Sequence, residues 1–408
     1  MHRPYLTTAD SPRHMWISRR LLLWVVTMGP GVLGMVADND AGGVLSYLVT
    51  GSQNHLQWFL PALLFMAPLT YMIQELALRV ALATHLPYSQ IVSMKFGPVF
   101  AKINAVVLHL LNTIILVTEF IGMTSALTLL GFSWITGLAF SLVLVLGVTS
   151  VRRYQRMERF LLILAILNLA FIPSLFTIHP HLHTWRTAFS GSFNGNIAFL
   201  LLSLAGNAVA PWMIFWQQNA VWAGNVQTLE SGRQDIRLGV VVQIVMATTV
   251  MLIGALMAHG VIHGRNPLLW LKANGGATTA ELFAIGLFDA GFLAASTISV
   301  SSAWMVQEAF GKIPDRHQSP TQGSLAWLHT ASICLAALSV VMPHLSFSAM
   351  ALWAQALGAL WMPISLVILG LIASDRRIMG SMLIHRRKYL LAVTILVFAG
   401  LACSAFLP

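Results

Sequence analysis

Charged residues are scarce in this chain of 408 residues. Asp, Glu, Lys and Arg together make up 9% of it, against about 25% in an average soluble domain. Hydrophobic residues make up 57%, and apolar runs long enough to span a bilayer recur from Leu21 to Leu407. This composition excludes a soluble protein. The runs are also too long and too uniformly apolar for barrel strands, so we expect an all-α polytopic membrane protein.

Cysteine is nearly absent as well. Cys334 and Cys403 both lie in apolar runs, so we predict no disulfide framework. The chain also lacks low-complexity tracts, short repeats and long linkers, which argues against a separate soluble domain. The first apolar run is too long for a cleavable signal peptide and has no small-residue cleavage site. We therefore expect a single transmembrane domain over residues 1–408.

The hydrophobic pattern predicts eleven spans, with approximate ranges 21–50, 57–83, 101–127, 132–149, 158–177, 195–221, 238–260, 280–309, 325–343, 346–372 and 389–407. If the N-terminus is cytoplasmic, the cytoplasmic side holds all of the 23 Lys and Arg except Arg186, Arg265 and Lys272. This asymmetry predicts a cytoplasmic N-terminus and an external C-terminus, and it explains the net charge of +10 without a nucleic-acid partner. Short loops and the lack of a targeting signal point to a bacterial inner membrane.

Two of the predicted spans contain a polar interruption. The first contains ADNDAGG at residues 37–43, and the sixth contains AGNAVAPWM at residues 205–213. The two helices are five spans apart, so they would enter the bilayer from opposite sides. Two inverted repeats of five helices, each opening with a broken helix, form a known transporter plan. We expect repeat one at about 21–177, repeat two at about 195–372 and an extra helix at about 389–407.

The residues in the interruptions suit a cation. An Asp at the centre of a bilayer costs about 2.5–3.5 kcal/mol, and no Lys or Arg lies at that depth in any span. Glycines in the first interruption and Pro211 in the second let each helix unwind and free its carbonyls. Carboxylates, amides and carbonyls are the ligands of Mg²⁺, Ca²⁺ and Mn²⁺. We therefore predict a metal site made by Asp38, Asn39, Asp40, Gly206, Asn207 and Ala210.

Five stretches resemble the Nramp (natural resistance-associated macrophage protein) family, and the resemblance extends over nearly the whole chain. They are GPGVLGMVADNDAGG, YMIQELALRVALATH, TEFIGMTSAL, GNAVAPWMIFWQQNAV and ASTISVSSAWMVQEAFG. The resemblance implies the inverted-repeat fold shared with sodium-coupled amino-acid symporters. It also implies divalent metal transport by alternating access, and hence a transporter and not an enzyme.

The chain departs from the family's metal motifs in the two interrupted helices. The family's Asp-Pro-Gly-Asn reads Asp40-Ala41-Gly42-Gly43 here, so the Asp is kept and the Asn is lost. In helix 6, Ala210 stands where the family has a Met, and Trp212 where it has a His. A thioether favours transition metals, so its loss removes a filter against Mg²⁺. The family's His belongs to its proton route.

Helices 3 and 10 depart from the family too. Helix 3 keeps Glu119, but Leu116 replaces the acid three residues before it. The family's metal-contacting Gln of helix 10 aligns with Trp361. These changes resemble the divergent Nramp-related magnesium transporters, which implies transport of Mg²⁺ and Mn²⁺ without proton coupling. The metal is then the substrate, with no cofactor and no obligate protein partner beyond the bilayer.

Three further polar residues are candidates for the route or a gate: Glu119, Gln218 and Gln355. Three other functions stay open. A proton-coupled Mn²⁺/Fe²⁺ importer would need the missing Met and His of helix 6. An amino-acid or organic-cation symporter would need a site that accepts a carboxylate, which Asp38 and Asp40 disfavour. An intramembrane aspartyl protease would need a second Asp, for which Asp289 is the one remote candidate.

Overall fold

The computed structural model describes residues 29–178, 182–191, 195–223, 226, 228–256, 267–312, 323–342, 346–383 and 388–406. These residues are helical, with no strand among them, as the sequence predicts. The first six predicted spans correspond to α2 (Pro30–Asp38) with α3 (Ala41–Gly51), α4 (Leu56–Thr84), α6 (Pro98–Leu129), α7 (Trp134–Thr149), α8 (Tyr154–Leu164) with η1 (Ala165–Ala170) and α9 (Phe171–Phe176), and α11 (Gly195–Ala208) with α12 (Pro211–Trp222). The remaining five correspond to α13 (Leu229–Leu256), α14 (Pro267–Ala309), α15 (Ala326–Ser339), α16 (Phe347–Ala373) and α18 (Lys388–Phe406).

Short helices join some of the spans. They are α5 (Tyr88–Phe96), α10 (Leu182–Thr187), α17 (Arg376–Met379) and η3 (Gly380–Met382). The helix starts follow ordinary chemistry, because Pro30, Pro98 and Pro211 occupy first-turn positions where the missing N–H is harmless. Ser133 and Ser346 cap α7 and α16 through their side chains.

The structure differs from the predicted spans at several boundaries. The start of the first predicted span, at residue 21, and the ends of the seventh and eleventh, at 260 and 407, lie outside the described residues. The fifth span is broken by the 3-10 segment η1. The eighth begins earlier than predicted, at Pro267, because a separate helical segment precedes it and joins it at Gly276, where φ is +86°.

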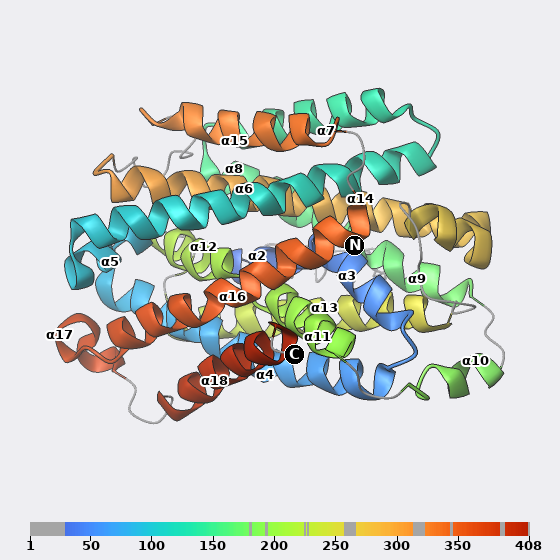
Figure 1. The fold of residues 1–408 in the computed structure, drawn as a ribbon. Helices are drawn as coiled ribbons and strands as arrows, with labels where there is room; N and C mark the ends of the chain where they lie inside the picture. The colour runs from blue at the N-terminus through green and yellow to red at the C-terminus, as the bar shows by residue number, and fades with distance from the viewer. Residues whose placement is uncertain are drawn as a thin grey trace, which may run out of the picture.

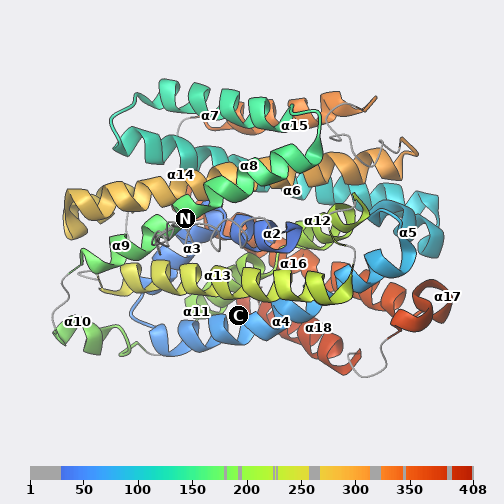
Figure 2. The same ribbon diagram turned by 180° about the vertical axis from the view of Figure 1, so that it is seen from behind.

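The broken helices lie in the middle of the bundle (Figures 1 and 2). Both views show α7 and α15 along one edge of the molecule and α4 and α18 along the other. Between these edges, α2, α3, α11 and α12 pack against the long helices α4, α13, α14 and α16. The interruptions are therefore enclosed by protein, which is where non-helical backbone is tolerated at membrane depth.

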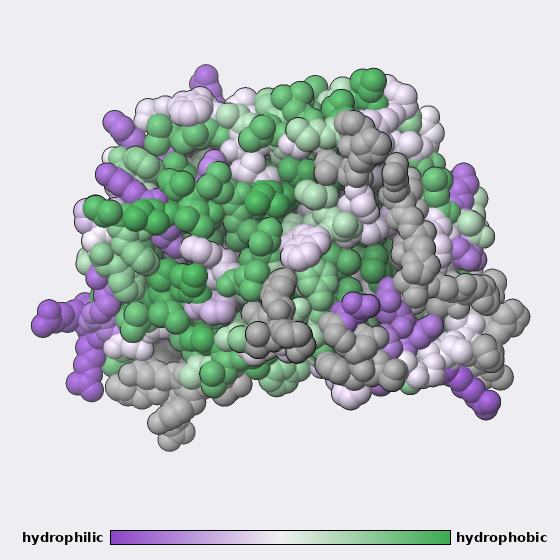
Figure 3. All heavy atoms as spheres, viewed as in Figure 1, coloured by the Kyte–Doolittle hydropathy of each residue, from purple (hydrophilic) through white to green (hydrophobic). Residues whose placement is uncertain are grey.

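The outer surface suits a bilayer. Large apolar side chains are exposed on the outer helices, among them Ile135, Val143 and Phe176 at 70–77% exposure. Figure 3 shows hydrophobic residues over most of one face, with hydrophilic residues mainly toward its two ends, one of which carries α5 and α17. Seven of the described helices are long and apolar enough to cross a membrane, and four shorter apolar helices accompany them. The chain is an integral membrane protein.

Candidate cation site

The first helix breaks at Asn39 and Asp40. Asn39 has φ −75° and ψ 54°, and Asp40 is extended with ψ 169°, so α2 ends and α3 restarts here. The Asp40 carboxylate caps α3 by accepting the N–H of Gly43 at 2.5 Å. A side chain at Gly43 would overlap the amide of Asn207, so this glycine allows the two interrupted helices to meet.

The sixth helix breaks at Val209 and Ala210. Ala210 is extended, with φ −87° and ψ 145°, and Pro211 starts α12. The break frees the carbonyl of Ala208, which accepts hydrogen bonds from Thr70 Oγ1 at 3.0 Å and from Gln243 Nε2 at 3.2 Å. Gly206 allows close packing in the structure, because any side chain there would overlap the backbone of Gln355 on α16.

Asp40 lies at the centre of the site and is 2% exposed. Gln355 donates from Nε2 to both of its carboxylate oxygens, at 2.9 and 3.2 Å. The helix 10 glutamine that meets the site in this structure is therefore Gln355, six residues before Trp361, the position that aligns with the family's Gln. Trp361 lies six residues further along α16, on a different face of the helix and partly exposed.

Asp38 is held from the second half of the chain. Gln243 of α13 donates from Nε2 to Asp38 Oδ2 at 2.5 Å. The backbone N–H of Ala210 also points at this carboxylate, which links it to the break in helix 6. The neighbouring Asn39 donates from Nδ2 to the carbonyl of Gln243 at 2.9 Å.

Glu119 of α6 approaches the site from a third side. Its Oε2 accepts the N–H of Ala41, the first residue of α3, at 2.8 Å. Its Oε1 accepts the hydroxyl of Thr118 at 2.9 Å. Glu119 therefore binds the start of α3 next to Asp40, with which it interacts electrostatically.

The site has a net excess of negative charge. Among the described residues, no basic side chain forms an ion pair with Asp38, Asp40 or Glu119. Asp40 is close enough to both of the other acids to interact with them electrostatically. A buried carboxylate without a counter-charge is costly. No group of three His, Cys, Asp or Glu in the described part of the chain is arranged to hold a metal without other ligands. A cation here would need amides, carbonyls or water in addition.

Amides supply many of the remaining polar atoms. Buried amide atoms without a hydrogen-bond partner occur on Asn39, Asn207, Gln217, Gln218 and Gln243. Asn207 also faces the hydroxyl of Tyr47, although neither group meets hydrogen-bond geometry. Gln217 and Gln218 are neighbours on α12, so the helical period predicts that only one of them faces the interior of the bundle. In the structure both side chains are buried.

The structure brings most of the predicted metal residues together, because Asp38, Asn39, Asp40 and Asn207 all lie at the two breaks with Gln355 and Glu119 against them. Gln243 was missed. Its only signal in the sequence is that it is a lone polar residue within the apolar stretch VVVQIVMA. Asp289, another buried acid, lies outside this set and accepts the Asn168 amide at 2.6 Å, which fits a contact between helices.

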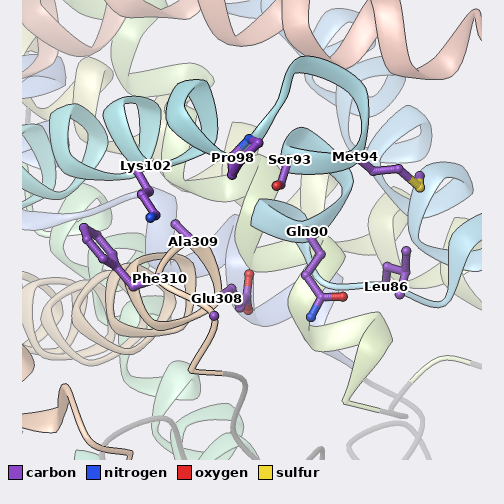
Figure 4. Close-up of a pocket in the computed structure, with 10 residues that line it drawn as sticks. Leu86, Gln90, Ser93, Met94, Pro98, Lys102, Glu308, Ala309 and Phe310 are labelled. Carbon is purple, nitrogen blue, oxygen red and sulfur yellow. The ribbon is translucent and has the colours of Figure 1, made fainter.

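A separate cleft of about 640 Å³ lies at the end of α14, between α5 and α6 (Figure 4). Glu308 lines it, and the carboxylate accepts the N–H of Ser89 at 3.2 Å and the amide of Asn219 at 2.9 Å. None of its lining residues belongs to the site around Asp40. The cleft is therefore distinct from the candidate cation site.

Known structures share this fold. A manganese transporter of Eremococcus coleocola, in complex with an aromatic bis-isothiourea compound, matches with a TM-score of 0.75 and 14% identity over 97% of this chain and 87% of that one. A mutant of the same transporter matches with a TM-score of 0.74 and 16% identity over 97% and 88%. A nucleobase-cation-symport-1 family transporter in a closed conformation matches at 0.55, with 12% identity over 93% and 91%.

The sequence matches no curated protein. It does match the model of a protein family, described as natural resistance-associated macrophage protein-like, over residues 31–407. This match spans both helix breaks and every helix that contributes to the site. The chain belongs to the Nramp family.

Proposed function

We propose that the protein transports divalent metal cations, Mg²⁺ and also Mn²⁺, across the membrane by alternating access and without proton coupling. The observation that carries this proposal is Asp40, a buried carboxylate in the break of helix 1. Asp38 and Glu119 lie nearby, and no cationic side chain in the part of the chain that the structure describes is paired with any of the three. A divalent cation would offset the charge that the protein itself leaves uncompensated.

The chemistry of the ligands favours a hard, partly hydrated ion. The site offers carboxylate and amide oxygens, and Ala210 provides no sulfur. Met213 is buried one turn further along α12. Mg²⁺ gives up water reluctantly and is usually bound by one or two carboxylates together with water. The buried amides without partners are suitable neighbours for such water.

The structural matches to manganese transporters keep Mn²⁺ among the substrates. Mn²⁺ accepts the same oxygen ligands as Mg²⁺. Trp212, at the position of the family's His, is fully buried against Trp216 and carries no group that titrates. This supports transport without a proton route through helix 6. We place the protein in a bacterial inner membrane, with the N-terminus in the cytoplasm.

Flux into proteoliposomes tests the proposal. Mg²⁺ and Mn²⁺ are each added outside vesicles that contain a pH dye, and both metal entry and internal pH are followed. We expect Mg²⁺ entry without acidification. Mn²⁺ entry that acidifies the lumen, with no entry of Mg²⁺, would instead establish a proton-coupled importer of the usual family type.

Asp40 gives the first mutational test. Asp40→Ala removes the central carboxylate, so we expect Mg²⁺ uptake to be abolished while the purified protein stays folded and monodisperse. Asp289→Asn is a matched control, because it neutralises another buried intramembrane Asp that lies apart from the two breaks. Normal uptake by Asp40→Ala would refute the assigned site.

A further inference from the structure

Gln243 connects the two helix breaks from a third helix. Its side chain is fully buried on α13, and its Nε2 donates both to Asp38 Oδ2 at 2.5 Å and to the carbonyl of Ala208 at 3.2 Å. Its backbone carbonyl accepts the amide of Asn39 at 2.9 Å. One residue therefore bonds to the end of α2 and to the end of α11.

The side-chain amide of Gln243 and a cation bound at Asp38 would compete for the same atom, Asp38 Oδ2. A cation bound to Asp38 through Oδ2 would have to displace the N–H that this oxygen now accepts. Gln355 makes the equivalent contact at Asp40. The two acids are thus each bonded to a glutamine amide, and these amides come from two different helices, α13 and α16.

The other end of the Gln243 amide is unused. Its Oε1 is buried and has no hydrogen-bond partner in the described part of the chain. A half-turn of the amide would exchange Nε2 for Oε1 and present an acceptor where a donor now lies. Gln243 can therefore donate to Asp38 in one arrangement and withdraw that donor in the other, which leaves Asp38 Oδ2 available to a cation.

We propose that Gln243 is a positioning residue that replaces the cation at Asp38, so that the carrier can reorient after its cargo has left. This rests on the proposed function. A carrier that returns without cargo must pass through a state in which Asp38 is closed off from water on both sides, where an unpaired carboxylate is strongly disfavoured. The Gln243 amide supplies a donor at that stage. Its second hydrogen bond, to the carbonyl of Ala208, keeps the break in helix 1 next to the break in helix 6.

Two transport assays separate this role from simple support of the fold. Net uptake into metal-free vesicles requires the carrier to return without cargo. Exchange, with metal on both sides, lets every return step occur with cargo bound. For Gln243→Met, which keeps the length of the side chain but removes the donor, we expect net uptake to fall about tenfold, as for a lost hydrogen bond to a charged group, and exchange to fall far less.

Binding gives an independent readout. Because Gln243→Met has no amide to displace, we expect the purified variant to bind Mn²⁺ more tightly than wild type in calorimetry. Gln243→Asn keeps an amide, but its side chain is too short to reach Asp38. We expect it to show both effects, and it replaces Gln243→Met if the Met variant does not fold. Gln234→Leu is the control, since Gln234 is exposed on the same helix and bonds only to Glu230.

The outcomes distinguish this inference from the proposed function. Equal loss of net uptake and exchange in both Gln243 variants would reduce Gln243 to a structural residue and overturn the inference. Unchanged net uptake would overturn it as well. The absence of both net uptake and exchange in the wild-type protein would instead refute the proposed function.

Discussion

The site is built from acids that are bonded to amides and backbone N–H groups. Asp40 accepts from Gln355 and Gly43, Asp38 from Gln243, and Glu119 from Ala41. None of these donors carries a full positive charge. The carboxylates are therefore held in place without being neutralised, which preserves their attraction for a cation.

Glu119 gives a prediction for a single residue. Its carboxylate caps α3 at Ala41, and a Gln could accept the same N–H while pairing with Thr118. We expect Glu119→Gln to keep its thermal stability, and Glu119→Ala to lose about 1–2 kcal/mol of unfolding free energy because the cap is lost. Thermal unfolding in detergent measures both variants.

The same pair of variants tests whether Glu119 also acts on the cation. If its role is confined to the cap, Glu119→Gln transports Mg²⁺ at the wild-type rate. Loss of uptake in a Glu119→Gln protein of normal stability would show instead that the negative charge itself is needed at the site.

The sequence identifies some of these residues much better than others. Asp38, Asp40 and Asn207 are conspicuous because they are polar and lie beside helix-breaking residues in apolar spans. Gln243 has no such context, since α13 is unbroken and the partners Asp38 and Asn39 are about 200 positions away in the chain. Contacts of that kind depend on how helices pack, and one sequence does not record this. The same limit hides the contact between Gln355 and Asp40, which are 315 positions apart in the chain.

At the scale of the helix, the start of α2 is the most strongly tied element of the site. Asp235 of α13 accepts three of its backbone N–H groups: Gly29 at 2.8 Å, Gly31 at 2.7 Å and Val32 at 3.2 Å. Trp216 of α12 donates to the carbonyl of Pro30 at 3.0 Å. A carboxylate is favourable at a helix N-terminus, where unpaired N–H groups and the positive end of the dipole meet.

Asp235→Ala should loosen α2. Removing a cap of this kind costs about 1–2 kcal/mol, so we expect the open population of α2 to rise roughly 5- to 30-fold. A cysteine at Met35, which is buried on α2, reports this as faster labelling by a water-soluble maleimide in detergent. The background carries Cys334→Ser and Cys403→Ser.

Asp375→Ala is the control for this change. Asp375 also caps a helix, accepting the N–H of Arg377 at the start of α17, but it is partly exposed and remote from α2. It should leave the labelling of residue 35 unchanged. An equal labelling rate in Asp235→Ala and its parent would show that the carboxylate does not restrain α2.

The positions of the helices could be predicted far more fully than their irregularities. Apolar runs identify the spans because length and hydropathy are properties of the sequence itself. The 3-10 segment η1 lacks a comparable signal, and no glycine or proline marks it. Asn168 within it bonds to Asp289 on α14, so packing against another helix accompanies the local change in geometry.

At the scale of the whole molecule, the distribution of charged side chains and that of exposed apolar side chains both fit a protein that spans a membrane. Exposed apolar side chains cover the outer helices, while α5 and α17, at one end, carry the ion pair between Lys95 and Asp375. Lys95 on α5 and Arg376 and Arg377 on α17 place basic side chains at this end. By the positive-inside rule we expect this end to face the cytoplasm.

The orientation can be tested with reporter fusions at the C-terminus. Because the cytoplasmic side is predicted to hold all but three of the 23 Lys and Arg, α18 should run from the cytoplasm outward. Alkaline phosphatase fused after residue 408 should then be active, and a green fluorescent protein at the same place should be dark. Fusions in the loop between α16 and α18, at residue 383, should give the opposite pair of results, since that loop is the most basic. A fluorescent C-terminal fusion would show that the topology is the reverse of the predicted one. The Asp235 cap of α2 would then lie on the external side of the membrane.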